Sequence, residues 1–385
     1  MTRTHHLRRS ALASALLALG ASPALHAADF KAGEWDLSVG GIVNAYYTTA
    51  KCSGDAVTGL GLGTKALGCG GKDSTTTVGN GLLPNVMSVS AKTRQEGYDI
   101  GATLMIGSAV SSTDSISNNN NVDVRQGFLT FGHAEMGTIK LGRDYGLFGS
   151  NAVLGDMTLL GAGAPVRATQ GNRVTLGHVG AGYTYLGHYG QVAYTLPAMG
   201  DFSLTAALMS PVDAYANANA TADKSPQLQV LATLKLGGAG KAWLGVKSQK
   251  FVGANGAADF TASGTEVGAS YSLGSVSLMA NLQTGKGLGV LADGDSGSQK
   301  QSNTLVQATW QATPKLKLGL GVGQTKLKEA TGNNLESTSS TTLGAYYGLT
   351  KSLTLVAEST GTTSKAADGS QAKLSGVALG GILFF

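Results

Sequence analysis

The sequence predicts an all-β protein, a transmembrane antiparallel β-barrel of about sixteen strands with a long third loop folded into its lumen. Apolar and polar residues alternate along most of the chain, as they do in strands with two different faces. Very short turns alternate with longer polar connections, such as residues 287–300. Charged residues are only 13% of the chain while hydrophobic residues are 42%, which argues against a disordered chain.

The first 27 residues predict a secretory signal peptide. Arg3, Arg8 and Arg9 precede an apolar run over residues 11–19, and a small-residue cleavage site follows at residues 25–27. This run is much shorter than the roughly 20 residues that a membrane-spanning helix needs. We therefore expect residues 1–27 to be removed on export and residues 28–385 to form the barrel.

The strands are predicted from segments in which every second residue is apolar. In "TPKLKLGLGVGQTKL", Leu316, Leu318, Leu320 and Val322 fall on one face, and lysine and glycine fall on the other. Sixteen such segments are expected near 34–49, 86–95, 98–108, 123–133, 137–144, 188–197, 201–210, 227–237, 241–251, 264–273, 275–285, 302–312, 315–326, 338–348, 352–362 and 372–385.

An open sheet of this size would leave two long unpaired edges, so the strands are expected to close into a barrel. Side chains cannot fill a barrel of this width, and its polar inner face would therefore line a water-filled channel. The chain ends in "LSGVALGGILFF", whose alternate apolar residues finish at Phe385. This apolar face is expected to meet lipid.

One connection breaks the alternating pattern, and we expect it to be functional. Residues 144–187 lie between two predicted strands and are rich in apolar residues, among them Leu147, Phe148 and Leu154. Loops longer than about 15 residues are uncommon and usually carry function. An apolar loop is stable if it folds against the inner wall, where it would narrow the lumen.

The two cysteines, Cys52 and Cys69, lie in a glycine-rich stretch. An even pair that closes a short loop in an exported protein is typical of a disulfide. Two free thiols are the alternative, and a metal site is disfavoured because the stretch contains no histidine.

Two stretches around the long connection resemble the general-diffusion porins of Gram-negative bacteria. The stretch "RQGFLTFGHAEMGTIKLGRDYGLFGSNAVLGDM" resembles their fourth and fifth strands leading into the third loop, and "GQVAYTLPAMGDFSLTAAL" resembles the following hairpin. The resemblance implies a homotrimer of sixteen-stranded barrels in the outer membrane, in contact with lipid and lipopolysaccharide. It also implies that Phe385 is an assembly signal for the barrel-assembly machinery.

In that family, basic residues on the wall face carboxylates on the third loop across the narrowest section. The resemblance assigns Arg143 in "LGRDYG" to one wall arginine and Asp156 in "LGDM" to a loop carboxylate, with Asp144 at the junction. The matched pore-constriction residues, taken together with the alternation, are Lys92, Arg94, Arg125, Lys140, Arg143, Asp144 and Asp156. Alternation places Lys92, Arg94 and Lys140 in the lumen, whereas Arg143 needs a bulge at Gly142 to point inward and Arg125 has the same difficulty.

We therefore expect a porin that lets small hydrophilic solutes and ions diffuse passively, with a weak preference for anions because the loop offers few acids besides Asp156. No cofactor, metal or nucleic-acid partner is expected. A substrate-selective channel is the first alternative. An exported all-β binding protein or enzyme is the second, although the scattered His133, His178 and His188 form no catalytic or metal-binding motif.

Overall fold

The computed structural model describes residues 28–59, 67, 69, 72–110, 122–165 and 174–385. The predicted signal peptide, residues 1–27, lies outside the described residues, as do residues 166–173 of the predicted third loop.

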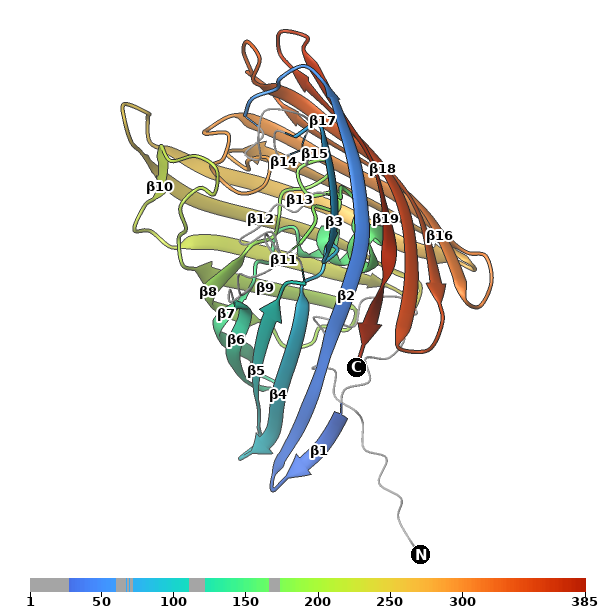
Figure 1. Cartoon of the computed structure of the whole chain (residues 1–385). Coiled ribbons are helices and arrows are strands. Elements are labelled where there is room, and N and C mark those ends of the chain that lie inside the picture. Colours follow the sequence, from blue (N-terminus) through green and yellow to red (C-terminus); the bar gives the residue numbers. More distant parts are fainter. Residues whose placement is uncertain (1–27, 60–66, 68, 70–71, 111–121, 166–173) are drawn as a thin grey trace, which may run out of the picture.

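Sixteen of the nineteen strands pair with their neighbours in chain order, every pair antiparallel, and β19 pairs with β2 to close the ring (Figure 1). The prediction of a closed sixteen-stranded barrel is thus confirmed. The strands are β2 (Trp35–Gly54), β4 (Asn85–Gln95), β5 (Tyr98–Ser108), β6 (Asp123–His133), β7 (Gly137–Tyr145), β8 (His188–Thr195), β9 (Phe202–Met209), β11 (Gln227–Leu236), β12 (Gly240–Gly253), β13 (Phe260–Leu273), β14 (Val276–Lys286), β15 (Lys300–Gln311), β16 (Leu316–Leu327), β17 (Leu335–Gly348), β18 (Leu353–Ala366) and β19 (Gln371–Phe384).

Three short strands add to this ring. β1 (Ala28–Ala32) and β3 (Ser74–Gly79) pair with different parts of β2, and β10 (Ala220–Ala222) pairs with β12. A short helix α1 (Ser150–Gly155) and a 3₁₀ turn η1 (Met157–Leu160) follow β7. Within the described part of the chain, no helix is long and apolar enough to cross a membrane.

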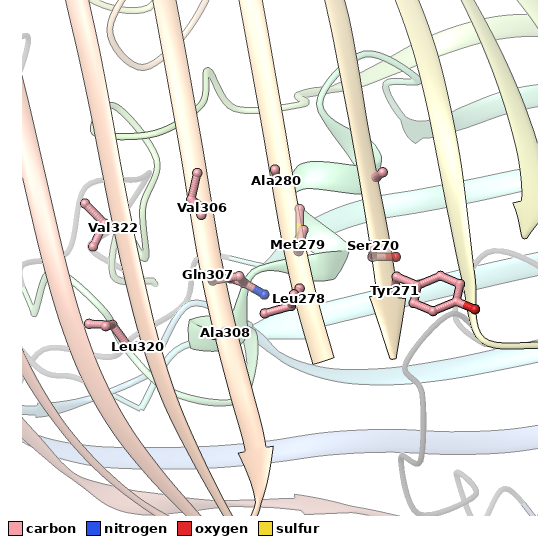
Figure 2. Close-up of a pocket in the computed structure, with 11 residues that line it drawn as sticks. Ser270, Tyr271, Leu278, Met279, Ala280, Val306, Gln307, Ala308, Leu320 and Val322 are labelled. Atoms are coloured by element: carbon pink, nitrogen blue, oxygen red, sulfur yellow. The ribbon is translucent and has the colours of Figure 1, made fainter. Parts of the chain in front are cut away.

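The two faces of the barrel wall differ in the way that the alternation predicts. On β15, the outward Val306 is 52% exposed, whereas its neighbour Gln307 is 8% exposed and lies on the inner face. Figure 2 shows the same pattern on β14 and β16, where the outward side chains of Leu278, Ala280, Leu320 and Val322 line a shallow apolar hollow of about 460 Å³. The outer face is therefore apolar and the inner face polar, as in a wall between lipid and water.

The last residue completes the seam of the barrel. The backbone N–H of Gly41 donates to the Phe385 carbonyl (2.7 Å), and the Phe385 N–H donates to the Gly41 carbonyl (3.1 Å). The Phe385 side chain is 43% exposed and lies on the outward side, in step with Leu383. The terminal aromatic residue thus extends the apolar outer face to the end of the closing strand.

Candidate functional site

The connection between β7 and β8 covers residues 146–187, and we call it the 146–187 loop. It begins two residues later than predicted because Asp144 and Tyr145 still pair with Tyr189 and His188 of β8. Asp144 is therefore a residue of the barrel wall.

The first part of the 146–187 loop is held by side chains from the inner face of the opposite strands. The backbone N–H groups of Leu147 and Phe148 both donate to Gln229 Oε1 on β11, at 2.7 and 2.8 Å. Gly149 N–H donates to Glu266 Oε2 on β13 at 2.8 Å. All three backbone donors would otherwise be unpaired, so these wall side chains satisfy the loop's polar groups.

The same type of contact continues along the loop. Met157 N–H donates to Gln307 Oε1 on β15 (2.9 Å), and the Ala162 and Gly163 N–H groups donate to Glu358 Oε2 on β18 (2.8 and 2.7 Å). From β2, the Tyr46 hydroxyl donates to the Leu160 carbonyl at 2.6 Å. Residues 147–163 therefore contact wall strands from β11 to β18 and β2, and Figure 1 shows the short helices within the ring of strands.

A stripe of glycines on β16 allows the loop to lie directly against the wall. A Cβ atom added at Gly323 would lie 1.9 Å from the Ala181 carbonyl oxygen, and one at Gly321 would lie 2.8 Å from His178 Cε1. Both distances are far too short for a real contact, so only glycine fits. The sequence placed these glycines on the polar face, but the alternation gave no sign that a loop lies over them.

The loop is also held together by a buried ion pair. His178 Nδ1 lies 2.9 Å from Asp156 Oδ1, and Asp156 Oδ2 accepts a hydrogen bond from the Tyr183 hydroxyl at 2.7 Å. Burial would raise the pKa of Asp156, but the charge of His178 and the hydrogen bonds it receives outweigh burial and lower it. Burial likewise disfavours the charge of His178, but Asp156 reverses this and raises the pKa of His178. Asp156 is only 2% exposed, and its negative charge is neutralised by His178 inside the loop.

Two other connections pack against the 146–187 loop: the one that follows β2 and the one between β14 and β15. The Tyr185 N–H donates to the Leu291 carbonyl (3.0 Å), and the Thr184 hydroxyl donates to the Gly289 carbonyl (3.1 Å). The two connections and the loop share one buried apolar cluster, which includes Val57, Leu67, Leu176, Val179, Val290 and Leu291. The sequence predicts residues 287–300 as one of the long polar connections. The apolar residues at 288, 290 and 291 were the available signal that it packs inward.

Cys52 and Cys69 belong to this cluster and are joined in a disulfide, with a Cα–Cα distance of 6.1 Å. The same connection is anchored where the Leu67 N–H donates to the Ser364 hydroxyl on β18 at 3.0 Å. The disulfide therefore lies beside residues that contact the 146–187 loop.

Arg125 and Asp144 lie near the end of the barrel where the long connections are, which we call the long-loop rim, and Lys140 lies on the same strand as Asp144 but nearer the short turn. Asp144 is buried and accepts hydrogen bonds from Lys140 Nζ and from Gln126 Nε2. Arg125 points inward, because the register of β5 and β6 shifts between Met105 and Gly107. This bulge removes the difficulty that simple alternation posed for Arg125.

Arg143 has a different environment from Arg125. β7 pairs with both neighbours without a register shift, so Arg143 keeps the parity of Ile139 and Leu141. Its side chain is exposed, and Nε donates to the Val124 carbonyl at 2.9 Å. The bulge at Gly142 that would turn Arg143 inward is absent from β7, all of whose residues are described.

Lys92 and Arg94 lie at the opposite end, where the short turns are. Asn85 lies at the other end of β4, and the seven residue-to-residue steps from Asn85 to Lys92 span about 23 Å of strand. Arg94 is exposed and forms an ion pair with Asp99 across the short turn, at 3.8 Å. Lys92 is in register with Lys140 through Gly101 and Thr130, three strands away. Among the described residues, no ion pair or hydrogen bond joins Lys92 or Arg94 to Arg125 or Asp144.

The inner wall carries further lysines that were not among the predicted site residues, and one of them, Lys247, is paired with Asp293 at 2.7 Å. Lys241 Nζ donates to Asn151 Oδ1 of α1 at 2.6 Å, and Lys317 Nζ lies 5.1 Å from the centre of the Tyr346 ring. Among the described residues, no carboxylate lies within salt-bridge distance of either lysine. The parity of "LKLGL" placed Lys317 on the polar face, but the sequence could not show that it lacks an acidic partner.

A closed sixteen-stranded barrel with an apolar outer face and a polar inner face defines a membrane channel of the porin class. The chain belongs to the Gram-negative porin family, whose model matches residues 13–367. The protein is therefore an outer-membrane channel for diffusion, and not an enzyme. The resemblance read from the sequence is confirmed, and the alternative of an exported enzyme is wrong.

Solved structures share the fold at low sequence identity. The outer-membrane channel DcaP of Acinetobacter baumannii is 15% identical with a TM-score of 0.68, covering 93% of this chain and 100% of that one. The anion-selective porin from Comamonas acidovorans is 17% identical with a TM-score of 0.65, covering 91% and 100%. Salmonella typhi OmpF, solved with daunomycin, is 15% identical with a TM-score of 0.59, covering 93% and 100%. No curated protein sequence matches the chain.

Proposed function

We propose that this porin is a narrow, weakly anion-preferring channel for small hydrophilic solutes and ions, with its narrowest section at the 146–187 loop. The observation that carries the proposal is the series of hydrogen bonds from the loop backbone to Gln229, Glu266, Gln307 and Glu358. A loop held at so many points of the inner wall stays inside the barrel and reduces the open cross-section of the channel.

The preference for anions follows from how the charges inside the barrel are paired. Asp156 is balanced by His178, and Glu358 accepts two backbone N–H groups, so both carboxylates are turned away from the water-filled part of the channel. Lys241 and Lys317 have no such acidic partner among the described residues. Unbalanced positive charge at close quarters favours the passage of anions.

We propose further that the protein is a homotrimer, because one similar structure, OmpT of Vibrio cholerae, was solved in a trimer form. Its apolar outer face would contact outer-membrane lipid and lipopolysaccharide. Residues 1–27 would be a cleaved signal peptide, and Phe385 would be read by the barrel-assembly machinery.

Planar-bilayer recording of the purified protein tests this function. A stable current in potassium chloride, with a reversal potential of the sign for chloride in a salt gradient, is the expected result. Zero current would contradict the channel function. A reversal potential of the sign for potassium would contradict the preference for anions.

A substrate-selective channel is the second candidate function, and one observation favours it. A pocket of about 130 Å³ lined by Leu176, Val179 and Leu291 offers an apolar surface that a channel for hydrated ions alone does not need. A selective channel would show a conductance that saturates with one class of solute.

A further inference from the structure

A pocket of about 130 Å³ lies at the long-loop rim, where five parts of the chain meet. Its walls include Leu82 ahead of β4, Leu176 and Val179 of the 146–187 loop, and Leu291 from the connection after β14. Arg125 is the one charged side chain among the described residues that line it. The pocket is thus apolar with a single cationic group in its wall, which is the usual make-up of a small-molecule site.

The guanidinium of Arg125 is held in a fixed orientation. Nε donates to Asp123 Oδ2 at 2.8 Å, and Nη1 donates to the Tyr185 hydroxyl at 3.1 Å. These two bonds use two of the five N–H donors that a guanidinium carries. Because Tyr185 accepts the bond from Arg125, its own O–H can donate to a ligand, and Tyr185 also lines the pocket.

We propose that this pocket binds a small organic carboxylate whose body is one apolar ring or a short branched chain. The inference rests on the proposed function, because it names a class of solute that the channel would take up. The carboxylate would accept hydrogen bonds from Arg125 and Tyr185, and the ring would lie against Leu176, Val179 and Leu291.

The size of the pocket agrees with this class of ligand. An apolar protein cavity of about 150 Å³ accommodates one benzene ring. A sugar or a hydrated ion would lose its hydrogen bonds to water against the leucine and valine walls, and these walls offer no replacement. A neutral ring would leave the guanidinium unsatisfied, whereas a carboxylate matches its planar donor geometry.

Asp123 accepts a hydrogen bond from Nε of Arg125 alone, so the other guanidinium N–H groups are the cationic donors in the pocket wall. An anionic ligand can accept hydrogen bonds from these donors, whereas a cationic ligand cannot.

Benzoate is the probe for the test, with acetate and benzyl alcohol as controls for charge alone and ring alone. Two readouts are used on the purified full chain: block of the chloride current in planar bilayers, and calorimetric titration in detergent. We expect benzoate to bind saturably and at least about tenfold more tightly than either control, because only benzoate uses both parts of the pocket. Equal effects of benzoate and acetate would overturn the proposal.

The double variant Asp123→Asn with Arg125→Gln removes the guanidinium without leaving a buried charge unpaired. It should weaken benzoate binding about tenfold or more, and Tyr185→Phe should weaken it less. Lys351→Gln, in an exposed short turn at the other end of the barrel, is the matched control and should bind benzoate like the natural protein. Unchanged binding in the double variant would overturn the site.

The two readouts separate this proposal from the proposed function. If the protein carries a chloride current but benzoate neither blocks that current nor binds in calorimetry, the proposed channel function stands and the proposed pocket is rejected. Calorimetric binding that the double variant loses, in a protein that carries no current, would support the pocket and reject the channel as proposed.

Discussion

His178 Nδ1 and Asp156 Oδ1 lie 2.9 Å apart inside the 146–187 loop, and neither side chain is exposed to solvent. The pair joins the residue that follows α1 to a turn in the second half of the loop, 22 residues further along the chain. Removing only one partner would leave an unbalanced buried charge, at a cost of about 3–5 kcal/mol. The pair is therefore the main internal support of the loop.

The pair makes the loop sensitive to pH. The pKa of Asp156 is lowered from 3.8 and the pKa of His178 is raised from 6.5, so stabilisation is complete between these two ordinary values. It falls below pH 3.8 as Asp156 is protonated, and it falls above pH 6.5 until the raised pKa of His178 is passed. Nearby Glu358 and Tyr183 act on the same pair. We expect brief current fluctuations from loop opening to increase above pH 6.5, as counted in single-channel records.

The control for this prediction is the double variant Asp156→Asn with His178→Gln, which keeps polar groups at both positions and removes both charges. Its fluctuations should be frequent at every pH and independent of pH in this range. If the double variant keeps the pH dependence of the natural protein, the pair is not its cause.

The glycine stripe on β16 predicts that a side chain at Gly323 displaces the loop. A Cβ at this position would lie 1.9 Å from the Ala181 carbonyl, so Gly323→Leu should force the loop away from the wall and raise single-channel conductance. Gly361→Leu on β18 is the matched control, because the nearest atom to its Cβ is 4.0 Å away. Equal conductance in the two variants would place the narrowest section elsewhere.

The barrel could be predicted from the sequence because its cause is local. Alternate residues point to opposite faces of a strand, so the pattern in "LKLGLGVG" shows both the strand and its two environments without knowledge of the neighbours. The closing of the ring then follows from the number of strands. What could not be read in this way is the arrangement of the connections, whose contacts join residues far apart in the chain.

The site residues illustrate this limit. Lys140 and Asp144 share one face of one strand, as alternation predicts, but residues four apart in a strand lie about 13 Å from each other, so their contact could not be predicted from alternation. Arg125 turns inward only through a bulge that depends on pairing with β5, which the sequence of β6 does not reveal. The sequence predicts Asp156 as a carboxylate that faces the channel, but in the structure it is paired with His178, 22 residues further along the chain.

The disulfide predicts a loss of stability on reduction. The Cys52–Cys69 bond closes a loop of 17 residues, which contributes roughly 3 kcal/mol in the chain-entropy model. The double variant Cys52→Ser with Cys69→Ser should unfold at a lower urea concentration than the oxidised protein, and reductant should have no further effect on it. Mass spectrometry of non-reduced peptides checks the bond directly, and two free thiols would refute it.

Phe385 is expected to matter more for assembly than for stability. Phe385→Ala keeps both backbone hydrogen bonds to Gly41 but removes the ring. If the ring is the assembly signal, this variant should reduce the yield of folded barrel about as strongly as deletion of Phe385, while the barrels that do form unfold at a similar urea concentration. A yield close to that of the natural protein for Phe385→Ala, but not for the deletion, would instead assign the role to the backbone seam.

The last prediction concerns ion preference, and it separates the residues predicted from sequence from those found in the structure. Lys241 and Lys317 lie on the inner wall without an acidic partner among the described residues, so the variant Lys241→Gln with Lys317→Gln should shift the reversal potential toward potassium. Lys315→Gln is the matched control, because Lys315 lies in an exposed short turn two residues from Lys317 and should leave the reversal potential unchanged. Lys92→Gln with Arg94→Gln should shift it less than Lys241→Gln with Lys317→Gln, since Lys92 and Arg94 are exposed and screened by salt, and Arg94 is paired with Asp99. A larger effect of Lys92→Gln with Arg94→Gln than of Lys241→Gln with Lys317→Gln would mean that ions are selected away from the 146–187 loop, and the proposed constriction would then not be the selective section.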